Sequence, residues 1–178
     1  MKTIMAHVVN WQRNCSYQIR LGIAAGRRMT EPFEILIVED YEPDAQFALR
    51  LFQKSRIANK LHVIRDGAEA LDYVFGSGTW AGRNTAHPPL VVLLDIRLPK
   101  LDGWEVLRQL KNNPLTRGIP VIMISGSLFA DEKAQSRQMG ATECLSKPLR
   151  IVELKAALAN SGLVWAMADQ EEVRQAAG

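Results

Sequence analysis

Residues 89–103 read PLVVLLDIRLPKLDG, in which a run of large apolar side chains ends at Asp95 and is followed by a proline-containing loop. The run shows no alternation of polar and apolar residues, which is typical of a strand that is buried on both faces. Four other short runs, bounded by turn-forming residues, are similar in composition: FEILIV (33–38), LHVI (61–64), IPVIMI (119–124) and ATECLS (141–146).

Segments with the apolar spacing of amphipathic helices lie between these runs. Apolar residues recur at helical intervals within 43–57, 102–112 and 149–160, among polar residues that would face solvent. Five strands that alternate with five helices predict a doubly wound parallel α/β domain. In such domains, functional sites form outside the carboxyl ends of the strands.

Polar residues follow four of the five predicted strands. The first strand is followed by Glu39 and Asp40, and three of the others lead to Asp95, Ser125 and Lys147. Because the carboxyl ends of parallel strands share one edge of the sheet, we expect these side chains to converge. Three carboxylates at one edge would repel one another unless a cation lay among them, and Mg²⁺ prefers oxygen ligands. The sequence therefore predicts a magnesium site at this edge.

The same residues have the composition of a phosphoryl-transfer site. Open coordination positions on the ion would accept phosphoryl oxygens, Lys147 would supply a positive charge, and the Ser125 hydroxyl would donate a hydrogen bond. Asp95 would be the nucleophile, with the charges of the reacting groups already compensated. The sequence contains no G-x-x-x-x-G-K-[ST] loop, which argues against a P-loop nucleotidase.

Four blocks of the sequence resemble the signature segments of response-regulator receiver domains: ILIVED (35–40), LLDIRLPKLDG (93–103), PVIMIS (120–125) and CLSKP (144–148). The resemblance covers residues 33–160 and implies a flavodoxin-like sheet with strand order 2-1-3-4-5. Two further stretches, DYVFGSGTWAGRN (72–84) and KNNPLTRGIP (111–120), are similar to stand-alone receivers that work with phytochrome-type histidine kinases.

The resemblance implies both a phosphoacceptor and its metal ligands. Asp95 matches the aspartate that accepts the phosphoryl group. Glu39 and Asp40 match the acidic pair that binds Mg²⁺ together with this aspartate, and the main-chain carbonyl of Arg97 matches a further metal ligand. The implied chemistry is self-catalysed phosphotransfer and dephosphorylation only, so we expect a signalling protein and not an enzyme in the ordinary sense.

The resemblance also assigns Ser125 and Lys147 to contacts with the phosphoryl group, and it implies a cis peptide bond before Pro148. One position departs from the family. Cys144 stands where receivers usually carry a Tyr or Phe that moves on activation, three residues before Lys147. Because a thiol has no ring to move, the usual coupling is in question, and a small buried apolar residue is the plainer interpretation of Cys144.

We therefore expect a single-domain response regulator that a histidine kinase, of the phytochrome type, phosphorylates on Asp95. The alternative is a pseudo-receiver, an interaction module that works without phosphorylation, which the missing aromatic residue would permit. Only 30 residues follow Pro148, too few for a helix-turn-helix effector, so we expect output through protein contacts.

The charge of the 178-residue chain is divided unevenly. Residues 1–30 contain five basic residues and no acidic residue, whereas the remainder contains 17 basic and 19 acidic residues. The net charge of +3 therefore comes from the N-terminal segment, and the domain at 31–161 shows no electrostatic footprint for nucleic acid. Residues 1–30 are either a disordered basic extension or an over-extended start, since Met29 would open the domain neatly.

The tail at 162–178 carries an apolar cluster after the last predicted helix, formed by Leu163, Val164, Trp165 and Met167. Such a cluster either folds back onto the domain or pairs with a second copy of the chain, and we expect a homodimer.

Two observations bear on the compartment. No apolar run approaches the roughly 18 residues needed to span a bilayer, so we expect no membrane partner. Cys15 and Cys144 fit neither a disulfide framework nor a metal site, which favours the reducing cytoplasm.

Overall fold

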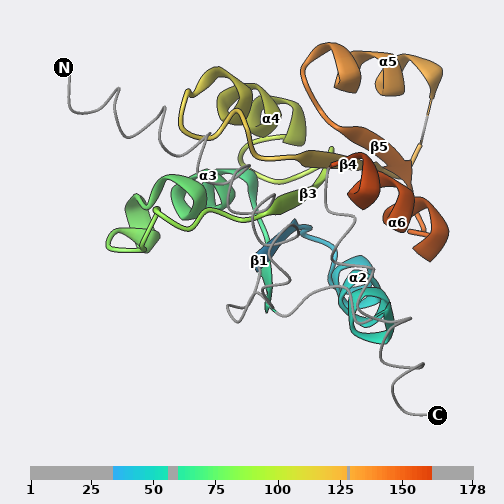
Figure 1. Ribbon diagram of the computed structural model, residues 1–178, viewed down its shortest axis with the longest axis horizontal. Helices are drawn as coiled ribbons and strands as arrows, with labels where there is room; N and C mark the ends of the chain where they lie inside the picture. The colour runs from blue at the N-terminus through green and yellow to red at the C-terminus, as the bar shows by residue number, and fades with distance from the viewer. Residues whose placement is uncertain (1–33, 56–59, 128, 162–178) are drawn as a thin grey trace, which may run out of the picture.

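The computed structural model describes residues 34–55, 60–127 and 129–161 of the chain. Five parallel strands form one sheet in the order β2-β1-β3-β4-β5, with helices on both sides (Figure 1). The elements are β1 (Glu34–Val38), α2 (Glu42–Ser55), β2 (Lys60–Ile64), α3 (Gly67–Phe75), the short 3-10 helix η1 (Gly78–Trp80), β3 (Val91–Asp95), α4 (Gly103–Asn112), β4 (Val121–Ser125), α5 (Ala130–Gln138), β5 (Glu143–Ser146) and α6 (Ile151–Asn160). The doubly wound parallel α/β fold and the predicted strand order are therefore confirmed.

Strands β3, β4 and β5 each begin two residues later than the sequence predicts. Proline accounts for two of these differences, because Pro89 and Pro120 lack the N–H group that a strand ladder uses. Pro120 contributes only its carbonyl, which accepts a hydrogen bond of 2.9 Å from the N–H of Val92.

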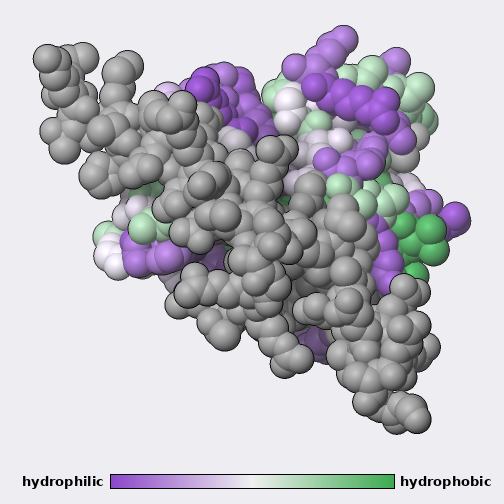
Figure 2. Space-filling view, viewed as in Figure 1, coloured by the Kyte–Doolittle hydropathy of each residue, from purple (hydrophilic) through white to green (hydrophobic). Residues whose placement is uncertain are grey.

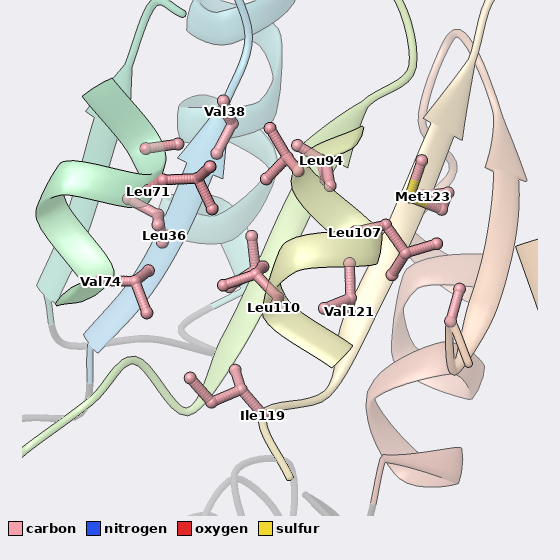
Figure 3. Close-up of a cluster of buried hydrophobic side chains, with 14 of the residues drawn as sticks. Leu36, Val38, Leu71, Val74, Leu94, Leu107, Leu110, Ile119, Val121 and Met123 are labelled. Carbon is pink, nitrogen blue, oxygen red and sulfur yellow. The ribbon is translucent and has the colours of Figure 1, made fainter. Parts of the chain in front are cut away.

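Helices cover both faces of the sheet, so the side chains of each central strand alternate between two apolar layers. Leu36 of β1 packs in the layer formed with α3 and α4, whereas Ile37 packs in the layer formed with α2 and α6. Figure 3 shows Leu107 and Leu110 of α4 among the apolar side chains of the first layer. Burial on both faces is the reason that the strands show no polar alternation in the sequence.

Helix α5 differs from the other described helices. Its sequence, ADEKAQSRQ, has no large apolar residue, and of its residues only Ser136 is buried. The helix lies beside β5 at the edge of the sheet, with hydrophilic side chains on its outer surface (Figures 1 and 2). Two ion pairs connect the helix to the first residue of β5: Lys133 and Arg137 lie 3.6 and 3.4 Å from the carboxylate of Glu143.

The predicted basic extension at 1–30 and the predicted dimerisation tail at 162–178 lie outside the described residues. Within the described part of the chain, no helix combines the length and the apolar composition that crossing a bilayer would require.

Candidate functional site

Main-chain hydrogen bonds align the carboxyl ends of the strands. The N–H of Glu39 donates to the last residue of β2 at 3.0 Å, and the N–H of Lys147 donates to the carbonyl of Ser125 at 2.8 Å. Each bond extends the parallel ladder by one residue beyond the end of a strand. The side chains at or just beyond the ends of β1, β3, β4 and β5 therefore start from one edge of the sheet, as the sequence predicts.

Three carboxylates meet at this edge. Glu39, Asp40 and Asp95 each offer an oxygen, and these oxygens lie within 4.8 Å of one another. Glu39 and Asp95 are only 3% and 5% exposed, whereas Asp40 is open to solvent. Burial raises the pKa of the Glu39 carboxyl to about 7, an effect that Lys147 opposes and the negative charge of Asp95 assists. An oxygen cluster of this charge fits a hard divalent cation such as Mg²⁺.

The ammonium group of Lys147 lies among the acidic side chains. Its Nζ is 2.6 Å from Glu39 Oε2, 2.6 Å from Asp95 Oδ2 and 2.9 Å from Asp44 Oδ2. Burial alone would lower the pKa of Lys147, but hydrogen bonds to the three carboxylates outweigh burial and raise this pKa. Lys147 therefore remains a cation at neutral pH, although four-fifths of its side chain is buried.

Asp44 is a site residue that the sequence analysis missed. It lies in the first turn of α2, one helical turn after Asp40, and this spacing returns its carboxylate to the edge of the sheet. The spacing of the two aspartates was the available signal. An acidic residue in the first turn of a helix is, however, also the ordinary partner of the helix dipole, so the signal was weak.

The loop that follows β3 contacts both the side chain and the backbone of Asp95. The N–H of Arg97 donates to Asp95 Oδ1 at 3.2 Å, while the Arg97 side chain is exposed. Gly103, at the start of α4, packs directly against this turn, because a Cβ there would lie 2.1 Å from the carbonyl oxygen of Asp95. A glycine at the end of the D-x-x-x-P-x-x-D-G pattern is therefore required by the close approach of α4 to the strand end.

A second contact, between Lys100 and Asp66, connects the same loop to α3. Lys100 has a φ of 62°, uncommon for a residue with a side chain, and its Nζ donates to Asp66 Oδ2 at 2.7 Å. Asp66 caps α3 by accepting a bond of 2.7 Å from the N–H of Glu69. The carboxylate of Asp66 thus joins the start of α3 to the loop that carries Asp95.

Ser125 is at the predicted strand end, but its hydroxyl is not bonded to the acidic cluster. Ser125 is buried at 3% exposure, and its Oγ donates to Glu132 Oε2 of α5 at 2.6 Å. The same Oγ accepts a bond of 3.1 Å from the N–H of Ser127. Glu132 was not predicted from the sequence, because an acidic residue in the first turn of a helix is common near any helix N-terminus.

Two further predictions concern β5 and the residues after it. The peptide bond between Lys147 and Pro148 is cis, as predicted. Cys144 is 1% exposed within the apolar layer that also contains Met123, and burial raises the pKa of its thiol. These properties agree with the interpretation of Cys144 as a small buried apolar residue.

Comparison with known proteins identifies relatives of this chain. The profile of the response regulator receiver domain matches residues 35–159. A probable methanogenesis regulatory protein, FilR2 of Methanothrix harundinacea, is 36% identical over 136 residues, which are 76% of this chain and 84% of that protein. The response regulator Rcp1 of Synechocystis sp. is 33% identical over 123 residues, which are 69% of this chain and 82% of Rcp1.

Solved structures agree with these relatives. The bacteriophytochrome response regulator AtBRR is 37% identical and superposes with a TM-score of 0.69, over 75% of this chain and 94% of AtBRR. The Mn²⁺-bound form of Rcp1 superposes with a TM-score of 0.63 at 29% identity, over 77% of this chain and 96% of the Rcp1 chain.

Proposed function

This chain belongs to the response regulator receiver domain family, and on this basis we propose that it accepts a phosphoryl group on Asp95 from a histidine kinase. The proposed reaction depends on Mg²⁺, and the proposed output is a contact with another protein. One observation carries the proposal: Asp95 is a buried carboxylate between two further carboxylates and the Lys147 ammonium. A buried nucleophile with this charge arrangement suits phosphoryl transfer, in which alignment and charge compensation supply most of the catalysis.

In the proposed reaction, an oxygen of Asp95 forms a bond to phosphorus as the bond between phosphorus and the kinase histidine nitrogen breaks. The product is an acyl phosphate on Asp95. The N–H of Arg97 orients one oxygen of the carboxylate and Lys147 contacts the other. Lys147 then has a phosphoryl oxygen as a new acceptor, and Ser125 donates its hydroxyl to another.

The proposed metal site uses Glu39, Asp40 and Asp95, with the main-chain carbonyl of Arg97 as a further ligand. When bound, Mg²⁺ supplies positive charge against the phosphoryl oxygens. The Mn²⁺-bound structure of Rcp1 supports a divalent cation in a relative of this chain. The chemistry of three oxygen ligands at one sheet edge supports the same choice here.

The proposed partner is a phytochrome-type histidine kinase, and the similarity to the bacteriophytochrome response regulator AtBRR supports this choice.

We assign the receiver domain to residues 31–161 and place the protein in the cytoplasm. We also propose that residues 162–178 mediate a homodimer. Light scattering tests the last point: we expect a dimer for the full-length protein and a monomer for a chain that ends at Ser161.

Intact mass measurement after incubation with acetyl phosphate and Mg²⁺ tests the acceptor. We expect the wild-type protein to gain one phosphoryl group and Asp95→Asn to gain none, because an amide cannot form an acyl phosphate. Asp102→Asn, on an exposed aspartate of the same loop, is the matched control and should be labelled normally. Labelling of Asp95→Asn at the wild-type level would move the acceptor elsewhere. A wild-type protein that is never labelled, in the presence of Mg²⁺, would favour the pseudo-receiver.

A further inference from the structure

The Ser125 hydroxyl already has an acceptor, and that acceptor is not part of the acidic cluster. Its single proton is donated to Glu132 Oε2 at 2.6 Å, the length of a charge-assisted O–H···O⁻ hydrogen bond. A hydroxyl has one proton to donate, so Ser125 cannot serve Glu132 and a phosphoryl oxygen at once. The two negative groups therefore compete for one donor.

Glu132 belongs to a helix with few other contacts to the active-site edge. α5 begins after Phe129, which makes no side-chain capping bond, and of its residues only Ser136 is buried. The ion pairs of Lys133 and Arg137 connect α5 to Glu143, at the opposite end of β5 from Lys147. Among the described residues, the bond between Ser125 and Glu132 thus links a side chain of α5 to the strand ends that form the site.

We propose that Glu132 is a positioning residue that keeps the Ser125 hydroxyl away from Asp95 until a phosphoryl group replaces it as the acceptor. This inference rests on the proposed phosphorylation of Asp95 and concerns its regulation. When Ser125 changes acceptor, the carboxylate of Glu132 loses its donor, and the first turn of α5 loses its contact with β4. The exchange couples phosphorylation to α5 through a hydrogen bond and requires no aromatic residue at Cys144.

The position of Cys144 is consistent with this route. Cys144 is buried in β5, and burial, assisted by the negative charge of Glu132 on α5, raises the pKa of its thiol. The inner face of α5 is therefore polar, with Glu132 bonded to the end of β4 and Ser136 buried. A change at Ser125 acts on this face directly.

The affinity for beryllofluoride, an analogue of the phosphoryl group, tests the competition. In the presence of Mg²⁺, fluorine NMR titration of full-length protein should show that Glu132→Ala binds beryllofluoride about tenfold more tightly than wild type, a factor that corresponds to about 1.4 kcal/mol. Asp131→Ala is the matched control, because it removes a carboxylate from the same turn that has no hydrogen bond or ion pair to any described residue. It should change the affinity less than twofold. Glu132→Gln keeps an oxygen acceptor without the charge and should fall between the two.

The same substitution made in a Ser125→Ala protein separates competition for the hydroxyl from a general effect of charge or folding. In Ser125→Ala the hydroxyl is absent, so adding Glu132→Ala should no longer change the affinity. An equal gain in both backgrounds, or equal gains from Glu132→Ala and Asp131→Ala, would overturn the role of Glu132.

Hydrogen exchange provides the readout on the helix. We expect beryllofluoride to lower the protection of the first turn of α5 in wild type, and Glu132→Ala to show that lowered protection without the ligand. Unchanged protection of this turn in wild type on binding would also overturn the inference. If beryllofluoride fails to bind wild type, or binds Asp95→Asn equally well, the proposed function itself is wrong, and this result is distinct from a failure of Glu132 alone.

Discussion

Helices α4 and α5 occupy equivalent places after neighbouring strands, yet they are attached to the sheet in different ways. α4 follows β3 and Asp95, and it buries Val106, Leu107 and Leu110 in the apolar layer. α5 follows β4 and buries only a serine among its residues. The loss of one contact would matter little for α4 and considerably for α5, because apolar burial is the main source of helix attachment.

The loops before the two helices show the same contrast. Gly103 is in contact with the backbone of Asp95 and Ile96, whereas a Cβ added at Gly126 would meet no atom of the described residues within 4 Å. Asp102 caps α4 by accepting a bond of 2.9 Å from the N–H of Glu105, and no side chain caps α5. Asp95, the candidate nucleophile, therefore lies next to the tightly packed helix α4. Ser125, whose hydroxyl is the candidate donor to the phosphoryl group, lies next to the loosely packed helix α5.

The largest difference in stability between the two helices should appear when a buried side chain of each is replaced by alanine. Leu107→Ala in α4 removes a fully buried side chain and should lower the free energy of unfolding by about 2–5 kcal/mol. Ser136→Ala in α5 removes only a local bond to the Lys133 carbonyl, and its cost should be below about 1 kcal/mol. Urea denaturation measures both. Equal costs would show that α5 is anchored as firmly as α4.

Alanine at the two loop glycines should give the next largest difference. Gly103→Ala forces a Cβ to within 2.1 Å of the Asp95 carbonyl oxygen, and it should cost about 1–3 kcal/mol and slow labelling by acetyl phosphate. Gly126→Ala meets no neighbour in the described part of the chain and should leave the stability within about 0.5 kcal/mol of wild type. Unfolding curves and intact mass together check this pair. A tolerated Gly103→Ala would contradict the tight packing of the loop that carries Asp95.

Changes at the helix caps should act in opposite directions. Asp102→Ala removes the cap of α4 and should lower stability by about 1 kcal/mol. Phe129→Ser offers α5 a side-chain acceptor at an uncapped, 65% exposed position and should stabilise its first turn by up to about 1 kcal/mol. Hydrogen exchange of each first turn, compared with urea midpoints, distinguishes local from global effects. A Phe129→Ser protein with unchanged exchange in α5 would mean that another contact already satisfies this turn.

A further difference should be a pH dependence at the end of α4. The ammonium of Lys111 donates to the Ile119 carbonyl at 2.7 Å, and burial lowers its pKa from 10.5 to about 8. Between these two values the unfolded chain binds more protons than the folded protein, so the contribution of Lys111 to stability rises with pH from about 8 to 10.5. Lys111→Met should remove this slope from the unfolding free energy, whereas Lys133→Met in α5 should keep it. A slope that survives Lys111→Met would assign it to another group.

Much of the fold follows from local sequence patterns. Apolar runs without alternation, such as VVLLD, can only be satisfied in a sheet that is covered on both faces, and crossover helices supply that cover. The predicted strands were displaced by two residues where prolines could not join the ladder. The resemblance to receiver domains added the strand order, which periodicity alone does not contain.

The candidate site also combines features that the sequence predicts with features that depend on the tertiary structure. Glu39, Asp40, Asp95 and Lys147 were predictable because each lies at or just beyond the end of a strand, and a parallel sheet brings all strand ends to one edge. The amino-acid sequence by itself therefore determined that these four residues meet at the site. Only the tertiary structure decided how they pair, since Asp44, Glu132 and the link between Asp66 and Lys100 depend on the angles at which helices and loops approach the edge. Those angles are set by packing between segments that are distant in the sequence, and no local pattern of residues encodes them.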